Sequence, residues 1–218
     1  YAAGTHIRCL LAVPLYILAE PFIDKRLAMA VRHLEKAGFL RADDASRFEV
    51  AVQKAAGMRD STIVEGFIFF VALAAMGLGL HLDLPPSIST WQLGEGGAPL
   101  QLTPAGWWNA AVSTTIFRLL FLRWFWRLLI WTVFLVRVSR LNLRLSAVHP
   151  DYAGGLLFLG VEQSSWNILV FAASCVVSAT IGQSMVFEGL SLYSFRDIIL
   201  LNTLIWLALI FGPLTVFS

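Results

Sequence analysis

The sequence predicts an all-α, polytopic integral membrane protein with about five transmembrane helices and a cytoplasmic αα-hairpin. The composition is the first observation: 58% of the 218 residues are hydrophobic, and the mean hydropathy is +0.73. The second is charge: only 14% of the residues are charged, whereas soluble domains carry about 25%. The third is a series of apolar segments near the roughly 20 residues that a spanning helix needs. We therefore treat residues 1–218 as a single transmembrane domain.

The first two predicted elements are a span over residues 3–19 and a helical hairpin over 20–61. Within the hairpin, apolar residues recur at helical spacing in two stretches, 22–37 and 44–56. A glycine follows each stretch at the position of a helix C-cap. We expect the two helices to pack together at the membrane surface.

The second predicted span covers residues 63–82 and begins with the capping box Thr62-Ile-Val-Glu65. The segment 83–106 is rich in proline and glycine and is expected to be an irregular outer loop. The fourth and fifth spans are predicted at 163–187 and 198–218, and neither contains a charged residue.

The third predicted span, 107–136, is too long for a simple crossing. Its 30 residues would form a helix of about 45 Å, against roughly 30 Å for the hydrocarbon core. Two interpretations stay open. The segment is one strongly tilted or kinked span, or residues 107–117 form a re-entrant or surface helix before a span at 119–136.

The lysines and arginines predict the orientation. Eight of the sixteen lie in 20–61, while the loop 83–106 has none. Cytoplasmic loops carry the excess of positive charge, so we expect 20–61 in the cytoplasm and the N-terminal end outside. Because the chain begins at Tyr1 without methionine and ends within an apolar run, we also expect it to be part of a longer protein.

The third span raises the main question about function, because it contains three arginines: Arg118, Arg123 and Arg127. Charges at membrane depth are normally paired or snorkelled. The acids expected at the inner membrane level are the candidate partners: Glu20, Glu65 and Glu162. Alternatively, the arginines face a wet cavity and form an ion path, since arginine-lined pores favour anions.

The segment "LSAVHPDYAGGLLFLG" predicts a structured turn at the cytoplasmic surface, formed by His149, Asp151, Gly154 and Gly155. Together with the tryptophan- and arginine-rich helix before it, and loosely with "LLAVPLYILAEPFID", it resembles a group of uncharacterised bacterial polytopic inner-membrane proteins. The resemblance covers about half of the chain. It implies location in the bacterial cytoplasmic membrane, and it carries no assigned activity.

Small residues at four-residue spacing in the fourth span are expected to allow close helix packing, within one subunit or between subunits: Ser174, Ser178 and Gly182. We predict no cofactor, no metal site and no catalytic residue, since the P-loop, dinucleotide, zinc-protease and nucleophile-elbow motifs are absent from the sequence. The net charge of +2 gives no reason to expect nucleic-acid binding.

Three functions are compatible with these features. The first is an oligomeric, anion-preferring channel or transporter for small ions, lined by the third and fourth spans. The second is a non-catalytic scaffold or accessory subunit of a larger membrane complex. The third is a membrane enzyme on a lipid-linked substrate, with His149, Asp151 and the arginines at the cytoplasmic face holding a phosphate. The expected partners are therefore the lipid bilayer and either further copies of the chain or other subunits.

Overall fold

The computed structural model describes residues 3–82, 103–144, 150 and 154–217. The elements in this part of the chain are all helices, without strands. Four long helices are apolar enough to cross a membrane: 34 residues from Ala3 to Lys36, 36 from Pro104 to Ser139, 32 from Leu157 to Glu188 and 26 from Leu192 to Phe217. The prediction of an all-α protein with helices long and apolar enough to cross a membrane is confirmed, while the number of five spans and the cytoplasmic hairpin stay predictions.

Each long helix is built from several consecutive elements. The first comprises α1 (Ala3–Ile7), the π-helical η1 (Arg8–Ala12) and α2 (Val13–Lys36). The second comprises α5 (Pro104–Trp108), the π-helical η3 (Asn109–Ser113) and α6 (Thr114–Ser139). The third comprises α7 (Leu157–Gln163), η4 (Ser164–Trp166) and α8 (Asn167–Glu188), and the fourth η5 (Leu192–Phe195), α9 (Arg196–Phe211) and η6 (Gly212–Phe217). Shorter elements lie between the first two: η2 (Ala42–Asp44), α3 (Ala45–Arg59) and α4 (Thr62–Leu82).

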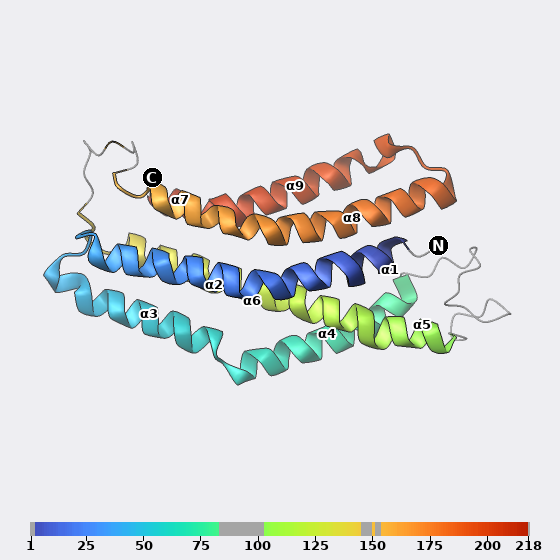
Figure 1. The fold of residues 1–218 in the computed structure, drawn as a ribbon, viewed down its shortest axis with the longest axis horizontal. Helices are drawn as coiled ribbons and strands as arrows, with labels where there is room; N and C mark the ends of the chain where they lie inside the picture. The colour runs from blue at the N-terminus through green and yellow to red at the C-terminus, as the bar shows by residue number, and fades with distance from the viewer. Residues whose placement is uncertain (1–2, 83–102, 145–149, 151–153, 218) are drawn as a thin grey trace.

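The helices form three groups along one common direction (Figure 1). In that view α8 and α9 lie on one side, α2 and α6 in the middle, and α3 and α4 on the other side. The end of α2, the start of α3 and the start of α7 gather at one end of the molecule. The N-terminus, α5 and the end of α8 gather at the opposite end.

The long helices do not divide where the sequence suggested. The predicted first span and the first arm of the hairpin are one continuous helix, which passes through Pro21 without ending. Likewise Pro104 to Ser139 is continuous, and the predicted alternative of two separate helices does not appear. With 36 residues this helix is longer than the roughly 20 that a spanning helix needs, so it would extend beyond one crossing of the hydrocarbon core.

The second arm of the predicted hairpin, α3, packs mainly against α6. Phe48 of α3 meets Phe134 of α6 edge-on, with ring centroids 6.0 Å apart. The indole Nε1 of Trp126 also donates to the carbonyl of Met58, at 3.2 Å. These contacts cover the apolar second half of α6, where Leu135 is completely buried.

Candidate functional site

The charged residues of α2 and α6 form one network. Arg123 Nη2 lies 3.0 Å from Glu20 Oε1, and Arg127 Nη1 lies 3.2 Å from the same oxygen. Arg127 Nη2 also donates to Asp24 Oδ1. Glu20 and Asp24 are four residues apart on α2, and Arg123 and Arg127 are four residues apart on α6. Each pair therefore lies on one face of its helix. The facing stripes place two negative charges against two positive ones.

Arg127 is the buried member of this network, with a side chain that is 7% exposed. Its guanidinium carbon lies 4.7 Å from the ring centroid of Trp124, a cation–π geometry. Trp124 is itself held in place, because its Nε1 donates to the carbonyl of Tyr16 at 2.9 Å. A buried arginine needs ion pairs and hydrogen bonds of this kind to offset its desolvation.

Arg118 has a different partner. Its Nη1 donates to the backbone carbonyl of Ala75 in α4, at 2.8 Å. This hydrogen bond joins the first half of α6 to α4, and it places Arg118 away from the network around Arg127.

The other two candidate acids lie elsewhere. Glu162 in α7 pairs with Arg26 of α2, at 3.7 Å between Oε1 and Nη1. Glu65 is exposed in the first turn of α4, and it makes no ion pair with any residue that the structure describes. Asp24, which the sequence reasoning missed, joins Glu20 as the partner of Arg127. The sequence does contain an indication of this role, because Glu20 and Asp24 have the same four-residue spacing as Arg123 and Arg127.

Two further predicted groups have modest structural roles. Gly154 and Gly155 have φ angles of 65° and 97°, which favour glycine and support a turn before α7. His149 and Asp151 lie outside the described residues. In α8, Ser178 is exposed, and a Cβ atom added at Gly182 would meet nothing within 4 Å. The buried face of α8 passes instead through Leu169, Ala172, Ala173 and Ile181.

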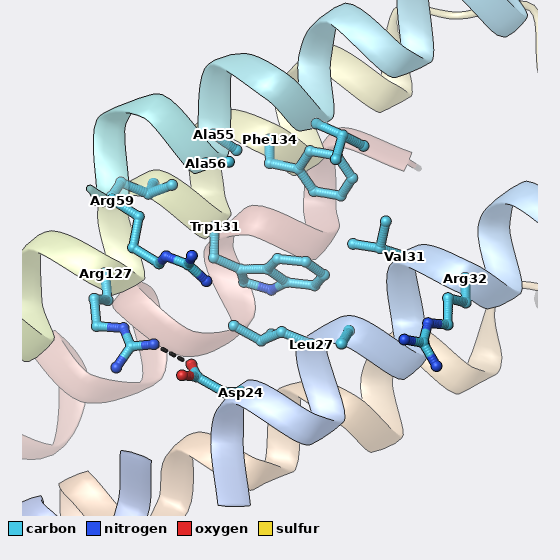
Figure 2. A pocket seen from close by; sticks show the side chains of 13 residues that line it. Asp24, Leu27, Val31, Arg32, Ala55, Ala56, Arg59, Arg127, Trp131 and Phe134 are labelled. Carbon is cyan, nitrogen blue, oxygen red and sulfur yellow. Dashed lines mark hydrogen bonds and ion pairs between the residues drawn. The ribbon is translucent and has the colours of Figure 1, made fainter. Parts of the chain in front are cut away.

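A cavity of about 320 Å³ opens beside Arg127, between α2, α3 and α6. Figure 2 shows Arg127, Asp24 and Arg59 together at one end and Arg32 at the other. Between these ends the wall is mostly apolar. Its uncharged lining residues are Leu27, Ala28, Val31, Val52, Ala55, Ala56, Ile130, Trp131 and Phe134.

Arg59 also has a local partner outside the cavity lining. Its Nε donates to Asp60 Oδ1 at 2.8 Å. This hydrogen bond lowers the pKa of the Asp60 carboxyl and raises the pKa of Arg59, so both groups stay charged at neutral pH. Asp60 is largely exposed, which leaves its charge screened by water.

Apart from Asp24, which Arg127 engages, the cavity presents guanidinium groups on an apolar wall, a combination that suits an anionic ligand with an apolar part. In the described part of the chain, no group of three or more His, Cys, Asp or Glu side chains could hold a metal ion. No protein-family model, curated protein or solved structure matches this chain.

Proposed function

We propose that the chain is a five-span membrane protein whose cavity between α2, α3 and α6 binds an anionic amphiphile. In this proposal α4 spans the membrane in addition to the four long helices, and the end of the molecule that holds α3 faces the cytoplasm. The lysine and arginine content of residues 20–61 supports that orientation.

The observation that carries the proposal is the composition of the cavity wall. Its volume of about 320 Å³ falls within the range of small-molecule sites, roughly 300–1,000 Å³. Nine uncharged residues surround an apolar space, and the four charged residues of the wall are Asp24, Arg32, Arg59 and Arg127. Such a wall stabilises a ligand both by apolar burial and by charge-assisted hydrogen bonds.

The position of the cavity supports the same conclusion. Trp126, which is partly exposed, precedes it on α6, and tryptophans in such positions concentrate at membrane interfaces. A ligand with an apolar chain reaches that level directly from the bilayer. The site therefore favours an amphiphile over a fully soluble anion.

Calorimetry with decanoate tests the proposal, using purified protein in nanodiscs of zwitterionic lipid and empty nanodiscs as the baseline. We expect saturable binding in excess of partitioning into lipid. Ala56→Phe should abolish it, because Ala56 lines the cavity and a phenyl ring would occupy the space. Ala45→Phe is the matched control, on the exposed start of the same helix. Equal binding by the two variants would refute the cavity as the site.

Small-anion transport is a second candidate function, and Arg118 is the residue with which to test it. Glu20 and Asp24 compensate Arg123 and Arg127, so these two arginines offer less free charge to a permeating anion. Arg118 lies on another part of α6, against α4. If the chain conducts anions, Arg118→Ala should change the anion current of reconstituted protein, whereas a silent wild type would rule out the channel.

A further inference from the structure

The charges around the cavity are not evenly placed. Asp24 and Arg32 are eight residues apart on α2, which corresponds to about 12 Å along a helix. Arg59 of α3 lies at the Asp24 end, beside Arg127. The cavity therefore has a guanidinium group at each end and an apolar middle.

The lining residues carry a net positive charge. Three arginines and one aspartate give 3 − 1 = +2. Among the lining residues, the Asp24 carboxylate is already engaged by Arg127, so Arg59 and Arg32 have no acidic partner within the cavity wall itself. Each of these two arginines lies at a different end of the cavity (Figure 2).

Neither surplus charge is held by a strong internal partner. Arg59 donates from Nε and Nη2 to its neighbour Asp60, but this pair is exposed to water, which screens it and lets a ligand acid compete for the guanidinium. Arg32 is exposed, and it makes no ion pair or hydrogen bond with the residues that the structure describes. Both guanidinium groups are therefore available to a ligand.

The wall between them is suited to an apolar linker. Leu27 and Val31 of α2 face Trp131 and Phe134 of α6 across this space in Figure 2. A polar linker would lose its hydration there without gaining hydrogen bonds, which disfavours it. An alkyl linker would lose no hydrogen bonds and would bury its surface.

We propose that the ligand is a dianion in which two acidic groups are separated by an apolar segment, with one group bound by Arg59 and the other by Arg32. This inference rests on the proposed binding function and narrows its ligand to one charge pattern. Two anionic groups neutralise the surplus of two positive charges, and a ligand with one anionic group leaves one end of the cavity unmatched. Arg59 and Arg32 are thus the residues that determine specificity.

The test compares three probes that differ only at their ends: decanedioate, decanoate and decanol. Affinities are measured by calorimetry in the nanodiscs described above, with wild-type protein. We expect decanedioate to bind about tenfold more tightly than decanoate, because it gains a second charge-assisted contact. Decanol should bind most weakly.

Three charge-removing variants complete the test: Arg32→Gln, Arg59→Gln and the control Arg41→Gln. Arg41 is exposed in the same region and does not line the cavity. Each of the first two variants should lose the preference for decanedioate, while Arg41→Gln should keep it. Circular-dichroism melts of every variant establish that the fold is retained.

The outcomes separate the two proposals. If decanoate binds and Ala56→Phe blocks it, but decanedioate binds no more tightly, the two-ended site is overturned and the binding function stands. If only one of Arg32→Gln and Arg59→Gln reduces the preference, the two-ended site is also overturned. If no probe binds saturably, the binding function itself is wrong.

Discussion

The helices α6 and α9 are both parts of long apolar helices that could cross a membrane, yet they lie in very different surroundings. Each of these long helices has an apolar window of 18 residues. In the helix containing α6, 39% of that window is buried inside the protein, against 11% in the helix containing α9. The first carries three arginines inside its apolar run, while the second has no charge after Asp197. In this pair, the helix that carries these charges is the more buried one.

The arginines and Trp131 of α6 find their partners on other helices, whereas Thr132 and Ser139 donate to carbonyls of α6 itself. Arg118 reaches α4, and Arg127 reaches α2. Trp131 Nε1 donates to Gln163 Oε1 of α7 at 2.8 Å, and Gln163 Nε2 in turn donates to the carbonyl of Ile210 in α9. Helix α6 is therefore surrounded by its partners, whereas α9 exposes most of its leucines and isoleucines.

The largest expected effect comes from removing apolar volume from α6. Leu135 is fully buried, so Leu135→Ala should lower the free energy of unfolding by about 4 kcal/mol. Leu204 of α9 is 62% exposed, and Leu204→Ala should cost less than about 1 kcal/mol. Unfolding by SDS titration in mixed micelles measures both. Equal losses would show that α9 is as tightly packed as α6.

Removing the ion pairs of α6 should lower the free energy of unfolding by a smaller amount. Arg127→Ala removes the charge-assisted hydrogen bonds of Arg127 to Glu20 and Asp24 and its contact with Trp124, and should cost about 2–3 kcal/mol. The control is Arg196→Gln at the start of α9, whose pair with Asp197 is exposed and should contribute at most about 1 kcal/mol. The same SDS titration applies. A cost for Arg127→Ala no greater than that for Arg196→Gln would remove the network as a reason for the position of α6.

The tryptophans should give a still smaller difference. Trp131→Phe removes the donor to the fully buried Gln163, and we expect a loss of about 1–2 kcal/mol. Trp206→Phe in α9 is the matched control, because no hydrogen bond of the Trp206 indole is present in the described part of the chain. Near-UV circular dichroism should report that the aromatic packing survives in both variants. If Trp206→Phe is the more destabilising, hydrogen bonding does not explain the difference.

The smallest expected effect is on the pH dependence of stability, through the Arg59–Asp60 pair outside the spans. Arg59 lowers the pKa of Asp60 in the folded state, from an ordinary value of 3.8. The pair therefore stabilises the fold above about pH 4, and this contribution is lost as the pH falls through the lowered pKa. Asp60→Asn should flatten the acid side of the stability profile slightly, measured by thermal melts from pH 7 to pH 3. An unchanged profile would mean that the pair is equally formed in the unfolded chain.

The sequence predicted part of the candidate site. Glu20 was expected near the arginines because both segments reach the inner membrane level, and it does pair with Arg123 and Arg127. Asp24 was missed because it was assigned to a separate hairpin helix. In one continuous helix it lies one turn after Glu20, on the same face.

The cavity could not be predicted from the sequence. Its wall combines residues from three helices that are far apart in the chain, such as Val31, Ala55 and Trp131. Periodicity identifies an apolar face on a helix, but it does not say which other helix covers that face. The docking of α3 onto α6 decides this, through contacts such as Phe48 with Phe134.

The sequence by itself determined that the chain is helical and that its helices suit a membrane, because composition and segment length fix the solvent that each segment prefers. It also determined that arginines on the third predicted span, 107–136, would need partners. Only the tertiary structure decided which groups those partners are, and where space is left between the helices. The physical reason is that pairing and packing depend on distances between side chains remote in sequence, such as Asp24 and Arg127.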